Sequence, residues 1–459
     1  MNQDLDQSEQ IKYLQSIKSV RETNLCTKDL ILDNKLENFD VDLSKLDSIV
    51  EFVINTIKSS FPDNESLLTI PVHGRYQHFE VGGKPRLTNL IENEFAKIDE
   101  LEICRKLIDL FIVSVLLDAG AGNLWKYNED GVEIGRSEGI AIASFHMFTN
   151  GDFSSLSSSG DDGLGKYQVN GDKLVNFTSD ELTKGFQVDE ITNPLEGFDG
   201  RVKLIKQLGV ALTNSEIFFG KDSRPGNLVD YLISKSELID GQYEIELEEL
   251  WNCLMTGFSS IWPEDGRIKV YGKVIGDAWF LKNRENYSKK ILNVKDDELL
   301  DSNKIVTFHK LTQWLTYSLF LPLIKYGKFK IKNSDLMTGL PEYRNGGLFV
   351  DFKLLNLKNE KLEQGLKLSK EINSKTLNIP TFIPSDDVIV EWRSCTICLL
   401  DYILPIINEK LEIKGTKYEL SLPQLIEAGS WKSGRLIAKE LRPESSGPPI
   451  DLLADGTVF

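Results

Sequence analysis

The sequence has few cysteines and no long apolar segment. Its five cysteines are odd in number and scattered along the 459 residues: Cys26, Cys104, Cys253, Cys395 and Cys398. This pattern favours a reducing compartment over a disulfide framework. The longest apolar run, residues 108–117, contains Asp109 and is too short to span a bilayer. The acidic start MNQDLDQSEQ lacks the features of a signal or transit peptide. We therefore expect a cytoplasmic protein with no membrane partner.

Basic residues are also in deficit. The chain has 53 Lys and Arg against 70 Asp and Glu, so its net charge is −17. Such a surface repels phosphate backbones, and no cluster of Lys and Arg in the sequence offsets it. Nucleic acid is therefore not expected as a partner. The 41% of hydrophobic and 27% of charged residues are typical of a globular protein.

Familiar site signatures are missing as well. The glycine-rich residues 120–122 and 135–139 fit neither GxxxxGK[ST] nor GxGxxG, which argues against a nucleotide cradle. Cys395 and Cys398 form one CxxC, but no second CxxC or neighbouring His accompanies it, so core packing is the expected role. Neither HExxH nor a Ser–His–Asp signature is present. We expect no metal and no cofactor, and carboxylates become the candidate catalytic groups.

Apolar residues recur at three- and four-residue spacing through several segments. The spacing predicts helices over residues 41–60, 98–118, 201–212, 244–262, 307–326 and 387–409. Segments with strand periodicity are few, so a mainly α protein is expected. Three further stretches are predicted to be irregular: 71–86 as an ordered loop, 151–165 as a mobile loop or lid, and 282–304 as a polar surface connection.

The segment TGLPEYRNGGLFVD, residues 338–351, carries a carboxylate, a phenol and a guanidinium in a row: Glu342, Tyr343 and Arg344. A proline fixes the backbone just before them, and two glycines permit close approach just after. We interpret this as a turn that presents three polar groups to one small volume. The alternative is a surface turn whose charged groups are solvated.

Other segments mix charge with aromatic residues. A small polar ligand with a flat face would suit a set of residues at 118–138, in which an aromatic ring stacks and Arg hydrogen-bonds: Asp118, Trp125, Tyr127, Arg136 and Glu138. Loop residues that tie turns together would look the same. His309 on the 307–326 segment is a candidate proton donor or a structural histidine. Asp277 and Asp351 complete the candidate carboxylates.

Long strings of the sequence resemble the uracil catabolism protein 4 family. They are HGRYQHFEVGG, LLDAGAGNLWKY, IGRSEGIAIASFHMF, HKLTQWLTYSLFLPL, LMTGLPEYRNGGLFVD, VEWRSCTICLLD, SWKSGRLIAKELRP and DGTVF. The match runs from about residue 70 to the end of the chain. The resemblance implies a role in the pathway that opens uracil in its ribosylated form and releases urea.

A more distant resemblance is to the queuosine salvage N-glycosylases, whose helical core is similar to helix-hairpin-helix DNA glycosylases. The parallels, in the same order along the chain, are Trp125–Tyr127–Gly131, NPLEGFDGRVKLIKQLGVAL, the segment 341–344, and VEWRSCTICLLDYIL. That family has Asp where Glu342 stands, so the reach of the carboxylate differs. The resemblance implies a DNA-glycosylase-like helical core with few short strands.

Taken together, these resemblances imply hydrolysis of an N-glycosidic bond in a small ribosylated degradation product, ribosylurea or its phosphate. Glu342 would stabilise or attack the oxocarbenium-like sugar, while His309, Asp118 or Asp277 would donate a proton to urea. The substrate-binding candidates are Trp125, Tyr127, Arg136, Glu138, Tyr343, Arg344 and Arg393. Residues 1–68 are expected as a helical extension and 69–459 as one catalytic domain. The alternatives are a ureide C–N hydrolase and a non-catalytic binding or scaffold protein of the pathway.

Overall fold

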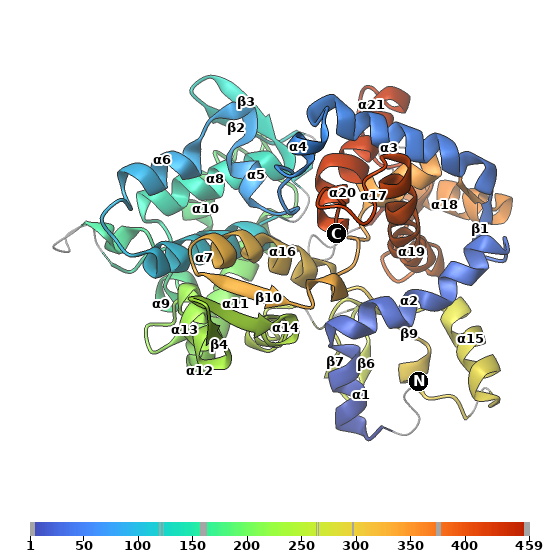
Figure 1. Ribbon diagram of the computed structural model, residues 1–459, viewed down its shortest axis with the longest axis horizontal. Coiled ribbons are helices and arrows are strands. Elements are labelled where there is room, and N and C mark those ends of the chain that lie inside the picture. Colours follow the sequence, from blue (N-terminus) through green and yellow to red (C-terminus); the bar gives the residue numbers. More distant parts are fainter. Residues whose placement is uncertain are drawn as a thin grey trace. The chain divides into compact units, whose positions relative to one another are not determined.

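The computed structural model is built mainly from helices joined by short strands (Figure 1). It describes residues 5–118, 121–122, 124–156, 163–262, 264, 266–295, 298–372 and 378–453. The strands have two to five residues each. The mainly α class expected from the sequence is therefore confirmed. In the described part of the chain, no helix combines the length and apolar character that crossing a membrane requires.

The described chain forms two compact units whose segments alternate along the sequence. Unit 1 contains residues 5–73, 264–310 and 335–453, and unit 2 contains residues 74–262 and 311–334, with the gaps given above. Each unit is thus built from segments that are distant in the sequence. The N-terminal residues that the sequence predicts as an extension form part of unit 1.

Unit 1 is a group of helices with two-stranded ribbons between them. Its helices are α1 (Gln7–Leu14), α2 (Ile17–Leu32), α3 (Leu46–Ser60), α4 (Asn64–Leu67), α15 (Lys282–Leu292), α17 (Tyr343–Asp351), α18 (Asn359–Glu371), α19 (Asp387–Lys410), α20 (Leu422–Leu425) and α21 (Trp431–Leu441), with a π-helical turn η8 (Ile426–Ser430) before the last. α19 packs against α2 and α17, and α17 packs against α21 (Figure 1). These contacts bring the start of α17 next to the C-terminal helices.

The ribbons of unit 1 join distant parts of the chain. β1 (Phe39–Val41) pairs antiparallel with β11 (Leu355–Leu357), β8 (Ala278–Phe280) with β9 (Ile305–Thr307), and β6 (Lys269–Val270) with β7 (Lys273–Val274), whereas β12 (Thr381–Phe382) pairs parallel with β13 (Asp451–Leu452). In the first pair Asp40 lies opposite Asn356. The β1–β11 ribbon therefore fixes the N-terminal segment to the C-terminal half of the same unit.

Unit 2 surrounds the buried helix α7 (Glu100–Leu116). Its other helices are α5 (Tyr76–Phe79), α6 (Arg86–Asn93), α8 (Arg136–Asn150), α9 (Gly171–Val175), α10 (Ser179–Gly185), α11 (Phe198–Asn214), α12 (Glu216–Phe219), α13 (Leu228–Lys235), α14 (Leu247–Gly257) and α16 (Lys310–Lys325). A hairpin of β2 (Lys126–Glu129) and β3 (Val132–Gly135) precedes α8, and β10 (Phe329–Lys332), β5 (Gln242–Glu246) and β4 (Glu237–Ile239) form a three-stranded sheet in that order. Asp99 caps α7 by accepting a bond from the Glu102 amide.

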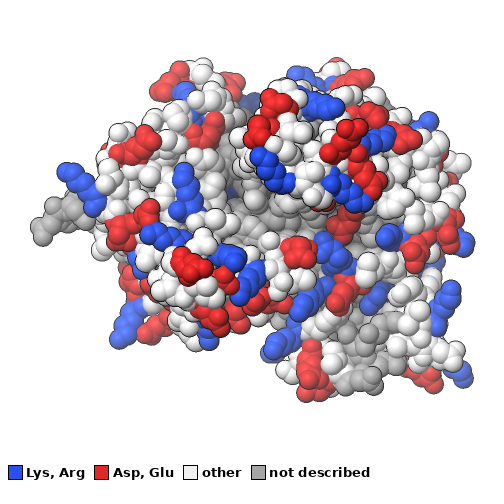
Figure 2. Space-filling view, in the orientation of Figure 1, with Lys and Arg blue, Asp and Glu red and all other residues white. Residues whose placement is uncertain are grey.

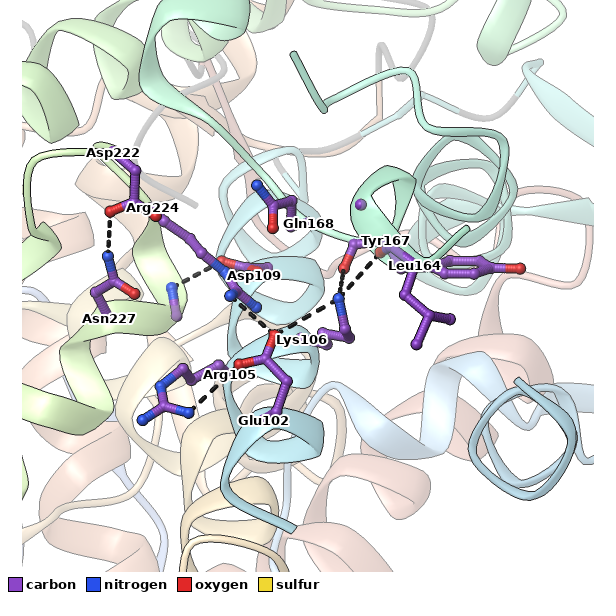
Figure 3. Close-up of polar contacts among 12 residues, drawn as sticks. Glu102, Arg105, Lys106, Asp109, Leu164, Tyr167, Gln168, Asp222, Arg224 and Asn227 are labelled. Atoms are coloured by element: carbon purple, nitrogen blue, oxygen red, sulfur yellow. Dashed lines mark hydrogen bonds and ion pairs between the residues drawn. The ribbon is translucent and has the colours of Figure 1, made fainter. Parts of the chain in front are cut away.

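A network of charged side chains lies beside α7 in unit 2 (Figure 3). The Arg224 guanidinium donates to Asp109 at 2.7 Å and contacts Glu102 at 2.9 Å. Lys106 donates to the carbonyl oxygens of Leu164 and Tyr167. Burial alone would lower the pKa of Arg224, but the two carboxylates outweigh burial and raise it. Arg224 therefore stays charged and ties α7 to the turn η5 (Pro225–Asn227).

Most of the predicted helices form close to the expected positions. α7, α11, α16 and α19 lie within a few residues of the predicted segments 98–118, 201–212, 307–326 and 387–409. The predicted helix 41–60 begins later, at Leu46, because residues 39–41 pair as β1 and Asp42 caps a short 3-10 turn. The predicted helix 244–262 begins at Leu247, after strand β5.

The irregular stretches were predicted less well. The expected surface connection 282–304 contains helix α15, which the sequence did not indicate. The buried side of that helix is polar (Asn283, Arg284 and Ser288), which hides the usual apolar periodicity. The expected loop 71–86 contains the short helix α5. Within the expected lid 151–165, residues 157–162 lie outside the described residues.

Charged side chains of both signs cover the face seen in Figure 2. Lys and Arg are interspersed there with Asp and Glu. On that face the basic groups have acidic neighbours, so they do not form a separate basic stripe. This arrangement agrees with the acidic balance of the sequence.

Candidate functional site

Glu342 is the N-cap of helix α17. Its backbone is extended, and its carboxylate accepts hydrogen bonds from the amides of Arg344 at 3.0 Å and Asn345 at 2.6 Å. The positive end of the helix dipole faces the carboxylate and stabilises its negative charge. The predicted turn is therefore the entry to a helix. Tyr343 is 37% exposed and Arg344 only 5%, and the Arg344 guanidinium carbon lies 5.5 Å from the Tyr343 ring centroid.

Arg344 stacks on an aromatic ring of a neighbouring helix. Its guanidinium carbon lies 4.3 Å from the ring centroid of Trp431, at the start of α21. The two helices can approach closely because Gly434 has no side chain. A Cβ at that position would lie 2.0 Å from the Arg344 carbonyl oxygen. The stack holds the guanidinium in a fixed plane, which is a useful geometry for binding hydroxyl or phosphate oxygens.

The π-helical turn η8 adds an acid–base pair beside that stack. Glu427 in η8 lies 2.6 Å from Nδ1 of His73, and the two side chains are 15% and 4% exposed. The His73 ring is 6.0 Å from the Trp431 ring. Such π-helical turns occur frequently at functional sites. We call Glu342, Arg344, His73, Glu427 and Trp431 the α17 site.

A buried hydrogen bond links η8 to the cap of α17. Ser430, the last residue of η8, donates to the side-chain oxygen of Asn345 at 2.8 Å. The Asn345 amide is one of the two donors to Glu342. The side-chain amide of Asn345 also donates to the carbonyl oxygen of Leu340 at 3.1 Å. The cap, the turn before it and η8 are therefore held together as one arrangement.

Three members of the α17 site were missed as candidates in the sequence. His73, Glu427 and Trp431 lie in or beside the strings HGRYQHFEVGG and SWKSGRLIAKELRP, which carry the family resemblance. Nothing local marks them as reactive, because 354 residues separate His73 from Glu427. Their position in or beside these strings is the only signal in the sequence that could have indicated these three residues.

Asp277 and Arg393 form a buried ion pair next to the turn that precedes Glu342. The guanidinium donates to both carboxylate oxygens at 2.8 Å, and Asp277 also accepts from the Lys310 amide and the Trp279 indole. Burial would raise the pKa of Asp277, but Arg393 together with the Lys310 amide and the Trp279 indole outweighs burial and holds this pKa well below the usual range. Asp277 therefore stays ionised and is unsuited to donate a proton. Arg393 also donates to the carbonyl oxygen of Pro341 at 3.3 Å, so the pair positions the turn.

His309 is buried and bound to the backbone. Its Nε2 lies 2.7 Å from the Leu14 carbonyl oxygen, and because a carbonyl only accepts, Nε2 carries the proton. Burial lowers the pKa of His309, so the ring is neutral near pH 7. Its φ of 43° is in the left-handed region, a strained conformation that functional positions often adopt. The contacts themselves indicate a structural role.

In unit 2, Asp118 belongs to a polar cluster around the buried Arg75. Arg75 donates to Asp118 at 2.8 Å and to the Ser114 hydroxyl at 2.8 Å, and the Ser137 hydroxyl donates to Asp118 at 2.7 Å. Burial lowers the pKa of Arg75, while the charges of Asp118 and Glu138 oppose that shift. The structure thus brings Asp118 and Glu138 to one cation, which the sequence did not indicate as a site residue.

The two aromatic candidates of unit 2 lie in its packed interior. The Trp125 ring is fully buried, stacks on Phe186 at 5.6 Å and donates to the Phe186 carbonyl oxygen. Tyr127 stacks on His146 at 5.7 Å. Each ring thus stacks on a protein ring, and a role of either in binding a ligand stays a prediction. Arg136 begins α8 with a φ of 56° and is partly buried.

The sequence-predicted site residues are thus divided between the units. Unit 1 holds Glu342, Tyr343, Arg344, Asp277, His309 and Arg393, and unit 2 holds Asp118, Trp125, Tyr127, Arg136 and Glu138. Convergence of all of them on one cavity stays a prediction. Asp351, a further candidate carboxylate, is bound by the Arg442 guanidinium through both oxygens.

Cys395 and Cys398 lie in the buried first half of α19. Burial raises the pKa of both thiols, which makes them poor nucleophiles and poor metal ligands. Across the described ranges, the structure places no group of three or more His, Cys, Asp or Glu side chains that could hold a metal ion.

Comparison with known proteins gives a consistent result. A protein family described as "Protein of unknown function (DUF1688)" matches residues 13–459. The chain is 50% identical over 456 residues to "Uracil catabolism protein 4" of Lachancea kluyveri, covering 98% of this chain and 99% of that protein. It is 42% identical over 425 residues to "Protein urg3" of Schizosaccharomyces pombe, covering 92% of each.

Proposed function

Because the chain belongs to the uracil catabolism protein 4 family, described as DUF1688, we propose that it acts in the cytoplasm as an N-glycosidase of uracil catabolism. Its substrate is a small ribosylated degradation product, ribosylurea or ribosylurea phosphate. Hydrolysis breaks the bond between the anomeric carbon and nitrogen, adds water to the carbon and releases urea. The net charge of −17 supports a small-molecule substrate rather than nucleic acid.

The cap position of Glu342 carries this proposal. Both carboxylate oxygens are held by backbone amides, at 3.0 and 2.6 Å, and each keeps a lone pair for a ligand. A carboxylate fixed in this way needs no rearrangement to stabilise positive charge on an oxocarbenium-like sugar. The helix N-terminus lowers its nucleophilicity, so we assign it electrostatic stabilisation of the cation and not covalent attack.

The neighbours of Glu342 support its role. Arg344, oriented by Trp431, is placed two residues away to bind hydroxyl or phosphate oxygens of the sugar. The Asp277–Arg393 pair fixes the Pro341 carbonyl directly before Glu342. α19 packs on α17 through a bond from the Trp392 indole to the Gly346 carbonyl. The start of α17 and the helix α19 contain two of the segments that resemble the queuosine salvage N-glycosylases. The proposal therefore includes a DNA-glycosylase-like helical core.

Purified protein incubated with ribosylurea or its phosphate tests the proposal. We expect free urea and ribose or ribose phosphate in equal amounts. Glu342→Gln should lower kcat by about 10²- to 10³-fold, the usual cost of removing one electrostatic stabiliser. Binding of ribosylurea, measured by calorimetry, should change little, because the amide keeps the shape of the carboxylate.

The control and the product analysis separate the alternatives. Glu440→Gln, at an exposed position on α21, makes the same chemical change and should leave kcat unaltered. Ammonia in place of urea would indicate a ureide C–N hydrolase. Ligand binding without any turnover would indicate a binding protein.

A further inference from the structure

Departure of urea from a sugar requires a proton, because the urea anion is a poor leaving group. The three donors that the sequence suggests are already engaged in other interactions. Asp277 is ionised by Arg393, Asp118 is paired with Arg75, and His309 is neutral and donates to a backbone carbonyl. A different group must therefore deliver the proton.

His73 and Glu427 form an acid–base pair in the same unit as Glu342. The 2.6 Å contact joins Nδ1 of His73 to a carboxylate oxygen, so Nδ1 carries a proton and donates it. The carboxylate orients the ring. With side-chain exposures of 4% and 15%, the pair is largely shielded from water, which strengthens the hydrogen bond between the two side chains.

Two connections place this pair beside the α17 cap. The Trp431 ring lies 6.0 Å from the His73 ring and 4.3 Å from the Arg344 guanidinium, so it is flanked by both groups. The turn η8, which carries Glu427, is bound through Ser430 to Asn345, and the Asn345 amide donates to Glu342. A continuous series of contacts therefore connects the His73–Glu427 pair to the fixed carboxylate of Glu342.

We propose that His73 is the general acid of the glycosidic cleavage and that Glu427 is its positioning residue. The carbon–nitrogen electron pair leaves with urea nitrogen, and the imidazolium transfers its Nε2 proton to that nitrogen. Water then adds its oxygen to the anomeric carbon, and its released proton returns to His73. The ring ends as imidazolium, so the cycle is balanced without another reactant. This inference rests on the proposed N-glycosidase function.

The test compares two leaving groups. His73→Gln keeps a polar side chain of similar length but cannot act as an acid. It should lower kcat on ribosylurea by about 10²- to 10⁴-fold, the usual contribution of general acid catalysis. On ribosylnicotinamide, whose leaving group departs neutral and needs no proton, the variant should lose far less of its kcat. Glu427→Gln should show the same selective loss at a smaller magnitude.

Each result decides between roles. The thermal midpoint and the Kd for ribosylurea should stay near the wild-type values, and Glu440→Gln should behave as wild type on both substrates. A His73→Gln enzyme within about threefold of wild type on ribosylurea overturns the inference. Equal losses on both substrates, or a collapsed thermal midpoint, overturn it too, because they indicate a structural role.

The two proposals fail in distinguishable ways. A wild-type protein that releases no urea refutes the N-glycosidase function itself. An active wild-type protein with an active His73→Gln variant refutes only the proton donor. If the wild type cleaves ribosylurea but not ribosylnicotinamide, the test uses ribosylurea alone. A lower kcat of His73→Gln with an unchanged Kd and thermal midpoint then supports His73 as the proton donor.

Discussion

The guanidinium of Arg393 donates to both carboxylate oxygens of Asp277 at 2.8 Å, in the interior of unit 1. Two more donors, the Lys310 amide and the Trp279 indole, complete the carboxylate's hydrogen bonds. The pair joins α19 to the segment before β8 and fixes the carbonyl that precedes Glu342. Its two members are therefore structural partners, although the sequence presented each as a candidate site residue.

Asp277→Asn should destabilise the protein strongly. The substitution leaves the Arg393 charge buried without a counter-ion, which costs about 3–5 kcal/mol when a buried pair is broken. Chemical denaturation followed by fluorescence measures the loss. Asp47→Asn, which affects an exposed ion pair with Lys410, should change the unfolding free energy very little. A similarly small effect of Asp277→Asn would contradict the structural role.

Glu342→Asp separates helix capping from chemistry. Asp caps helices as well as any residue, so the unfolding free energy should stay within about 0.5 kcal/mol of the wild type. The shorter side chain draws the carboxylate back from the substrate, and a displacement of about 1 Å can cost about 10²-fold in rate. Thermal unfolding and kcat on ribosylurea give the two readouts. Loss of stability in parallel with rate would show that Glu342 acts only as a cap.

Acid should weaken unit 2 through Glu129. Hydrogen bonds from Arg86 outweigh burial and, with those from Lys84 and His146, hold the pKa of Glu129 well below its ordinary value of 4.5. Below that value the unfolded chain binds a proton more readily than the folded one. The stabilisation is therefore complete above about pH 5 and is lost as the pH falls toward the folded pKa.

Glu129→Gln should remove that acid dependence. At pH 7 we expect a loss of about 3 kcal/mol, because the charges of Arg86 and Lys84 lose their carboxylate. The unfolding free energy of the variant should then fall less steeply between about pH 5 and pH 3 than that of the wild type. Glu133→Gln, an exposed position on the same hairpin, serves as the control. Parallel pH profiles for Glu129→Gln and wild type would contradict the pKa assignment.

Gly434→Ala should loosen the contact between α17 and α21. A Cβ there would lie 2.0 Å from a backbone oxygen, which cannot rotate away, so we expect a loss of about 1–3 kcal/mol and a lower kcat. Gly200→Ala is the matched control, because its Cβ meets no atom within 4 Å on the exposed side of α11. That change should stabilise the protein by about 0.5–1 kcal/mol. Thermal unfolding of both variants measures the opposite signs.

Sequence periodicity predicted the apolar helices well and the polar ones poorly. α7 and α19 carry apolar residues around much of their circumference, and their positions follow from spacing alone. α15 was missed because its buried face is bound by hydrogen bonds, such as the one from the Ser288 hydroxyl to the Asn303 carbonyl. A helix whose buried face is polar can be recognised only from its tertiary partners, and these are distant in the sequence.

The glycines after Glu342 explain the misreading of the central turn. Two adjacent glycines usually indicate irregular backbone. Here a Cβ on Gly346 would lie 2.6 Å from the Thr396 hydroxyl and 2.9 Å from the Trp392 indole nitrogen. The residue is therefore a helical glycine that permits close packing of α17 on α19. Only the neighbouring helix reveals that purpose, just as only the fold joins His73 to Glu427.

The alternation of the two units along the chain constrains how the protein is made. Residues 5–73 leave the ribosome first, but their unit is completed only by residues up to 453. At usual rates of synthesis the interval from residue 73 to residue 453 lasts roughly 20–80 s. Until α19, η8 and α21 are synthesised within this interval, the apolar side chains of α3, such as Val50, Val53 and Ile57, lack the partners that they contact in the folded unit. Unit 2 obtains its last described segment by residue 334, so it can close first while the nascent N-terminal helices await their partners.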